Sequence, residues 1–308
     1  MDHNVDQSVR LVLFSLSSIA IAFGMVVWMI AIIRLRLGIP VIKHEVRDEV
    51  PWRSIDLILV LAIFLAGQSL VLMVAHEAMD FPGERRLTNV EKEMVDQHPV
   101  HILMLEGRPL ILLMCGLTAS VVAPITEEFL FRVLLQGWLE ALRQRWRRFQ
   151  LVRALLPRGV GPILIVALLF AILHFRRVGN EPSDLSVLTV MIGGGAVANL
   201  VTMAFAIVLI SFRTGATTVD FGWKKEKFWS DVGLGISAFL AVAVPVFALQ
   251  AILKVFLPPH ISPDPIPLFF FALVLGTLYY RTHRIVPSVV LHMSLNSVSM
   301  LIAWLTLP

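Results

Sequence analysis

The chain has 308 residues, of which 57% are hydrophobic and 16% are charged, and its mean hydropathy is +0.81. Soluble domains usually carry about 45–50% apolar and about 25% charged residues, so this composition excludes an ordinary soluble protein and indicates a polytopic membrane protein. The formal net charge of +4 gives no reason to expect a nucleic-acid partner, and a single cysteine excludes an intramolecular disulfide and a cysteine-based zinc site.

Apolar runs long enough to cross a bilayer as helices recur along the whole chain. They cover about 11–33, 55–76, 109–141, 159–176, 186–212, 230–257, 266–280 and 285–306. An open sheet cannot pair its backbone polar groups in lipid, so each run predicts a helix. We therefore expect an all-α fold, a polytopic transmembrane helical bundle of about eight spans that forms one integral membrane domain over residues 1–308. Trp52, at the entry to the second run, is expected to be an interfacial anchor.

Basic residues gather in every second loop of this predicted bundle. The basic loops are 34–54, 143–158, 213–229 and 281–284, whereas the loop 77–107 is rich in acid. Because positively charged loops stay on the cytoplasmic side, the basic loops are predicted to be cytoplasmic and both termini to lie outside. We expect a multi-pass protein of a bacterial-type cell membrane whose site opens toward the cytoplasm.

Ionisable residues interrupt the third apolar run, which must form one long span, bent at Pro124, for the loops to alternate. The sequence there is Ala123-Pro-Ile-Thr-Glu-Glu-Phe-Leu-Phe-Arg132. A charge at bilayer depth costs about 3 kcal/mol on insertion scales, so membrane spanning alone does not explain these residues. Glu128 and Arg132 have the i, i+4 spacing of a helical ion pair, which leaves Glu127 on a neighbouring face, free to meet a cavity.

Two further polar pairs lie in later spans. Phe170 and His174 are four residues apart, as are His292 and Asn296, so each pair shares one helix face. Phe170 is expected to pack, and a lone intramembrane asparagine often only bridges two helices by hydrogen bonding. Counting from the basic loops places Glu127 and His174 at similar depth, well inside the membrane, and His292 and Asn296 closer to the cytoplasmic end of the last helix. We expect one cavity that opens toward the cytoplasm to join all three sets.

A carboxylate, two imidazoles and a carboxamide around one water molecule suit the hydrolysis of an amide. Glutamate can take a proton from water, histidine can orient that water or bind a metal, and histidine and asparagine can stabilise an oxyanion. Proton-coupled transport is the main alternative, because transporters also bury acids and histidines. A transporter would show paired broken helices with binding residues in both halves, and an inert scaffold would have lost a catalytic group.

These motifs resemble those of the CPBP family of intramembrane proteases, which contains CAAX prenyl proteases and bacteriocin-processing enzymes and is also called the ABI family. Its motifs are a glutamate pair followed after three residues by arginine, a phenylalanine followed after three residues by histidine, and a histidine followed after three residues by asparagine or aspartate. They are matched in this order by Glu127, Glu128 and Arg132, by Phe170 and His174, and by His292 and Asn296.

The resemblance covers roughly 109–176 and 266–300. It implies a CAAX-protease-like catalytic core at 109–176 and 266–306 and variable N-terminal helices at 1–108. Residues 183–262 depart from the shorter family pattern, because two extra spans separate the second motif from the third.

The activity implied by the resemblance is that of an endopeptidase acting on a membrane-associated peptide or protein. The substrate would be lipidated, as in CAAX processing, or bacteriocin-like. Glu127 would be the general base and would act with His174 on the attacking water. Glu128 and Arg132 would shape and hold the site.

The third motif and a metal complete the implied site. His292 and Asn296 would bind water or the oxyanion. Family members have been described both as metalloproteases and as glutamate-dependent proteases. The zincin pattern His-Glu-x-x-His is absent, so a tight zinc site is not indicated. A divalent metal ion such as zinc, held by Glu127, His174 and His292, stays open as an alternative.

Overall fold

The computed structural model is helical throughout the residues that it describes and contains no strand among them. These residues are 2–78, 99–104, 107–146, 148–150, 157, 159–175, 185–258 and 262–305. The α-helices are α1 (Asp2–Arg36), α2 (Ser54–Ala78), α4 (Pro99–Met104), α5 (Pro109–Leu117), α6 (Ala123–Glu128), α7 (Gly137–Arg145), α9 (Val160–Leu173), α10 (Leu185–Thr189), α11 (Gly195–Thr214), α12 (Phe228–Phe256), α13 (Pro265–Thr282) and α14 (Ile285–Leu305). Three π-helical segments, η1 (Thr118–Val122), η2 (Phe129–Gln136) and η3 (Val190–Gly194), and the 3₁₀ helix η4 (Lys225–Lys227) complete the set.

Seven helical stretches among the described residues are long and apolar enough to cross a membrane. They are Ser17–Arg36, Ser54–Glu77, Pro109–Arg145, Val187–Thr214, Lys225–Phe256, Pro265–Thr282 and Ile285–Leu305. The all-α, multi-pass bundle is therefore confirmed. The eighth expected span is α9, which has only 14 described residues. At 1.5 Å per residue that is about 21 Å, shorter than the hydrocarbon core of about 30 Å.

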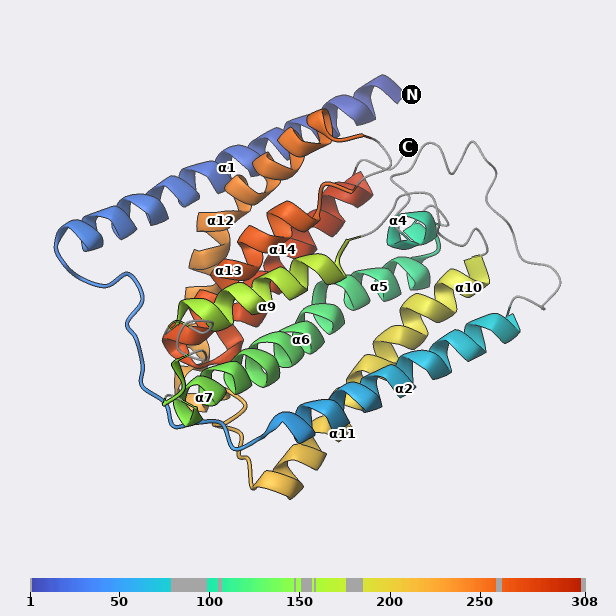
Figure 1. The fold of residues 1–308 in the computed structure, drawn as a ribbon. Helices are drawn as coiled ribbons and strands as arrows, with labels where there is room; N and C mark the ends of the chain where they lie inside the picture. The colour runs from blue at the N-terminus through green and yellow to red at the C-terminus, as the bar shows by residue number, and fades with distance from the viewer. Residues whose placement is uncertain are drawn as a thin grey trace.

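The helices run side by side (Figure 1). α1 packs against α12 at one edge of the bundle, and α2 packs against α11 at the other. Between these pairs lie α13 against α9, α14 against α12 and α6, and the long helix that contains α5, α6 and α7. The candidate site residues all come from these central helices, so lipid-facing helices flank them on both sides.

The expected span at 109–141 is one continuous helix, Pro109–Arg145, interrupted by the π segments η1 and η2 on either side of α6. In η1 the N–H of Ala123 bonds to the carbonyl of Thr118, five residues back. Pro124 is next and has no N–H, so it cannot pair with the carbonyl of Ala119 in the same register. The side chain of Asn296 in α14 donates to that oxygen instead, with Nδ2 2.8 Å from it.

The loop 37–53, which we call the strap, joins α1 to α2 across one end of the bundle (Figure 1). Trp52 in the strap is fully buried, its Nε1 donates to the carbonyl of Leu134 at 3.1 Å, and its ring stacks on Phe221 at 5.7 Å. The expectation of an interfacial anchor at Trp52 is therefore wrong. The strap folds back beneath the central helices and carries the indole into the core instead of into lipid.

Side chains from the four basic loops meet at the end of the bundle that the strap crosses. Arg284 pairs with Asp231 of α12 at 2.7 Å and with Glu45 of the strap. Lys224 lies 3.6 Å from Glu45, and Arg145 of α7 lies 3.1 Å from Glu49. The basic loops that alternate along the sequence thus lie together at one end of the molecule.

Candidate active site

Glu128 and Arg132 form an ion pair that is completely buried. Arg132 Nε lies 3.2 Å from Glu128 Oε2, which is the i, i+4 pair that the spacing predicts. The other carboxylate oxygen, Oε1, lies 3.1 Å from Nδ1 of His292 in α14. Glu128 therefore joins the arginine of its own helix to a histidine of another helix, and it fixes the orientation of that histidine.

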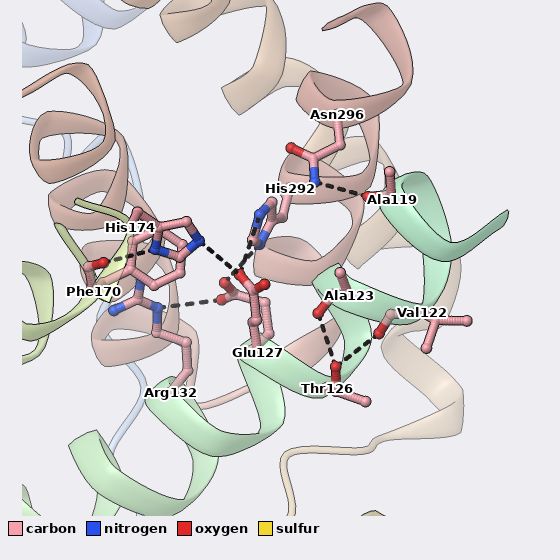
Figure 2. A network of polar contacts seen from close by, with 11 residues as sticks. Ala119, Val122, Ala123, Thr126, Glu127, Arg132, Phe170, His174, His292 and Asn296 are labelled. Carbon is pink, nitrogen blue, oxygen red and sulfur yellow. Dashed lines mark hydrogen bonds and ion pairs between the residues drawn. The ribbon is translucent and has the colours of Figure 1, made fainter. Parts of the chain in front are cut away.

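Glu127 points between two imidazoles (Figure 2). Its Oε2 lies 3.7 Å from Nε2 of His174 and 3.8 Å from Nε2 of His292. Both separations exceed a hydrogen bond, and this buried oxygen has no hydrogen-bond partner. The side chains of Glu127 and His174 are 27% and 33% exposed, so the site is open on this side. The acid and the two imidazoles, which come from three separate spans, do meet.

Hydrogen bonds at the far ring nitrogens assign the tautomers of both histidines. Nδ1 of His174, at the end of α9, lies 2.7 Å from the carbonyl oxygen of Phe170, which can only accept, so Nδ1 carries the proton. Nδ1 of His292 donates to the Glu128 carboxylate for the same reason. In their neutral forms both rings therefore present an unprotonated Nε2 toward Glu127. Three acceptors converge here, which suits a water molecule with two O–H groups to donate.

Phe170 packs at the centre of the cluster, as expected, and is fully buried. Its ring stacks on His174 with centroids 4.3 Å apart and meets the His292 ring edge-on at 5.9 Å. The guanidinium carbon of Arg132 lies 5.6 Å from the ring centroid, within the range of a cation–π contact. One aromatic ring thus holds both imidazoles and the arginine in place.

Asn296 binds backbone instead of pointing at Glu127. Its bond to the Ala119 carbonyl joins α14 to η1 directly ahead of the glutamate pair (Figure 2). Helix bridging, one of the two roles considered for this residue, is therefore present. Its second amide hydrogen and its oxygen are left for other partners, so a role with water or the oxyanion stays a prediction.

Comparison with known families finds a match that covers most of the chain. The family described as Type II CAAX prenyl endopeptidase Rce1-like matches residues 109–220 and 210–298, which together make up more than half of the chain. The chain belongs to this family. No curated protein and no solved structure matches it. All six predicted site residues lie within the matched ranges, which also run through the extra spans at 183–262.

Because it belongs to this endopeptidase family, the chain is a membrane peptidase. Family membership does not say whether the site binds a metal, so we consider the residues that could hold one. The acceptors of Glu127, His174 and His292 have the chemistry of a His₂Glu zinc site. Among the described residues, however, no group of three or more His, Cys, Asp or Glu side chains is arranged to hold a metal ion. A divalent ion at these residues stays a prediction.

Sequence reasoning missed polar residues that continue from this peptidase site along the same helix. Gln136 is fully buried and donates to Glu140 at 3.0 Å, and His283 lies 3.7 Å from the other oxygen of Glu140. A signal was present, because Glu128, Arg132, Gln136 and Glu140 follow one another at intervals of four residues.

Proposed function

We propose that this protein is an intramembrane endopeptidase that uses Glu127 to activate water against a peptide bond of a membrane-associated substrate. The substrate would be a lipidated, CAAX-type peptide or a bacteriocin-like peptide. The observation that carries the proposal is the unpartnered Oε2 of Glu127, which lies between the Nε2 atoms of His174 and His292. A transporter would need no such set of acceptors around one water molecule.

In the first step, a water molecule donates one hydrogen to Glu127 Oε2 and the other to Nε2 of His174, so its lone pair is directed at the substrate carbonyl carbon. Glu127 takes the proton as the oxygen attacks, which forms a tetrahedral intermediate with an oxyanion. In the neutral ring, the hydrogen bond from His174 Nδ1 to the Phe170 carbonyl leaves Nε2 as an acceptor for this water.

In the second step, the oxyanion is stabilised and the leaving amine is protonated. His292, whose Nδ1 is held by the Glu128 carboxylate, would donate to the oxyanion from Nε2 only in its doubly protonated form. The remaining amide hydrogen of Asn296 is a second candidate donor. Glu127 returns its proton to the amide nitrogen as the C–N bond breaks, so one water is consumed for each bond that is cut. Arg132 neutralises Glu128 throughout.

The orientation of the site is part of this proposal. The basic loops that meet at the strap are proposed to be cytoplasmic, in a cell membrane of bacterial type, because they carry the excess of lysine and arginine.

The test uses purified protein in lipid nanodiscs and a farnesylated C-terminal CAAX peptide, beside a hydrophobic membrane peptide without a lipid. Glu127→Gln should lower kcat about 10²- to 10⁴-fold, because it removes the general base. His174→Asn should lower it similarly, since asparagine keeps a donor for Phe170 but has no group at the Nε2 position. Glu226→Gln makes the same change on the exposed η4 and should have no effect. Full activity of Glu127→Gln would remove this residue from the mechanism.

Treatment with EDTA addresses the metal separately. Because the proposed steps need none, we expect activity to survive chelation. Activity that is lost with EDTA and restored by zinc alone would assign a divalent ion to Glu127, His174 and His292.

A further inference from the structure

Buried polar side chains continue from the site toward the basic end of the bundle. Arg132, Gln136 and Glu140 follow one another along η2 and α7, and His283 lies beyond them in the turn between α13 and α14. We call these four residues the polar column. The proposed mechanism uses only Arg132, at the inner end.

Direct contacts link Gln136, Glu140 and His283. Gln136 Nε2 donates to Glu140 Oε1 at 3.0 Å and to the carbonyl of Gly276 at 2.9 Å. Nδ1 of His283 lies 3.7 Å from Glu140 Oε2. Arg132 and Gln136 are fully buried, and the side chains of His283 and Glu140 are only 11% and 12% exposed.

The column lies where η2, α9 and α13 meet, inside the bundle. A Cβ atom at Gly276 would lie 3.1 Å from Gln136 Oε1 and 3.0 Å from Ile163 of α9. Glycine at this position therefore lets Gln136 and Ile163 pack closely against α13, and a methyl group here would crowd both side chains.

Unpaired polar atoms occur on three of the four residues of the column. Nη1 and Nη2 of Arg132, Oε1 of Gln136 and Nδ1 of His283 are buried and have no hydrogen-bond partner within the protein. Leaving such a group unsatisfied costs about 1–3 kcal/mol, so buried polar groups are normally paired with protein or with ordered water. The guanidinium offers donors and the amide oxygen an acceptor, so water can bridge them.

Polar side chains of the strap cover the outer end of the column. The ring of His44 lies 5.8 Å from that of His283, and its Nδ1 is also buried without a partner. Arg47 donates to the hydroxyl of Tyr279 at 2.8 Å. His44 and Arg47 are half-buried, so the column ends close to solvent beneath polar groups.

We propose that the polar column binds a file of ordered water molecules and delivers water from the basic end of the bundle to Glu127. This rests on the proposed function, in which each cleavage consumes one water. The exposed side of Glu127 and His174 is where the substrate must sit, so a bound peptide blocks that approach. The column reaches the site from behind, past Arg132 and Glu128.

Thiol reactivity tests the hydration of the column without any measurement of activity. In a Cys115→Ala background, Gln136→Cys is compared with Val133→Cys, because both positions lie in η2 and have 0% exposure. A thiol reacts as the thiolate, which forms readily only beside water, so Gln136→Cys should react with methyl methanethiosulfonate at least about tenfold faster. Equal rates at the two positions would mean a dry column and would overturn the proposal.

Kinetics test the delivery of water. Gln136→Leu places an apolar side chain in the column and should lower kcat about tenfold with KM unchanged, because chemistry and not binding is limited. Leu139→Ala is the matched control: it removes buried volume from α7 without touching the column and should lower only the melting temperature. If Gln136→Leu does not fold, Gly276→Ala narrows the column by one methyl group. A folded column variant with wild-type kcat would show that water arrives by another route.

Failure of the proposed peptidase function and failure of the water column can be told apart. If wild-type protein cleaves none of the peptides, the proposed function fails, while the thiol comparison still decides whether the column holds water.

Discussion

Glu128 and Arg132 show how this bundle tolerates charge at membrane depth. Each is fully buried, and each contacts further groups, His292 for the acid and the Phe170 ring for the base. A buried ion pair is a weak source of stability, but losing one partner leaves an uncompensated charge. The pair is therefore best understood as the support that orients His292.

Arg132→Met should destabilise the fold by about 3–5 kcal/mol, because it leaves the Glu128 carboxylate buried beside one histidine only. Thermal unfolding in detergent measures the effect. Adding Glu128→Gln to Arg132→Met should recover part of the loss, since the double variant has no unpaired charge. A single variant that melts like the wild type would show that Arg132 does not compensate Glu128.

At the scale of helices, the turn before the glutamate pair is held by a bond between two elements. Pro124 leaves the Ala119 carbonyl without its π-helical donor, and Asn296 of α14 supplies one. Thr126 adds a hydroxyl bonded to the Val122 carbonyl at 2.9 Å. Because Pro124 has no backbone N–H, the Ala119 carbonyl is free to accept from Asn296, and this bond ties α14 to the helix that contains α6.

Asn296→Ala should cost about 1–3 kcal/mol, because the Ala119 carbonyl is left without its donor. Pro124→Ala should reduce that cost, since alanine brings back an N–H that can bond to the same oxygen. Chemical denaturation of the two single variants and the double variant gives the coupling free energy between the two substitutions. Strictly additive effects would contradict this reading of the π segment.

The turn between α13 and α14 predicts a dependence of stability on pH. Burial, with Arg47 and His44 nearby, lowers the pKa of His283 from 6.5 to about 3. Below pH 6.5 the unfolded chain binds a proton at this residue that the folded chain does not, so stability should fall as the pH drops from 6.5 toward 3. The melting temperature should show this loss.

His283→Asn is the control, because His283 has φ 49° and asparagine accepts this left-handed conformation. Between pH 6.5 and about pH 4.5, which lies inside the titration range of His283, its melting temperature should fall less than that of the wild type. Parallel profiles for the two proteins would exclude His283 as the titrating group.

At the scale of the whole molecule, the shared end of the basic loops predicts sidedness. In a Cys115→Ala background, an impermeant maleimide should label Val46→Cys and Thr218→Cys from one face of sealed vesicles and Pro258→Cys from the other, since α12 runs between the two ends. The first two should react from the cytoplasmic face. Labelling of Val46→Cys and Pro258→Cys from the same face would contradict the prediction that the basic loops lie on one side of the membrane and the intervening loops on the other.

The parts of this architecture that could be predicted are those that hydrophobicity and four-residue spacing encode. The span containing Glu127 and the meeting of its carboxylate with His174 and His292 follow from apolar runs and from side chains that share a helix face. The partners of Asn296 and Trp52 could not be predicted, because each donates to a backbone carbonyl of the long helix, and carbonyls carry no sequence signal.

The π segments on both sides of α6 have a consequence for insertions and deletions. A π turn holds one more residue than an α turn, so η1 and η2 set the rotation of the glutamate pair relative to both ends of its helix. A residue deleted from η2 would be taken up by closing the π segment into a regular α-helix, so α7 would keep its rotation relative to Glu127, whereas the same deletion in a regular α-helix turns everything beyond it by about 100°. Because the extra residue is confined to the π segment, we expect η2 to tolerate a one-residue deletion that a regular helical stretch would not.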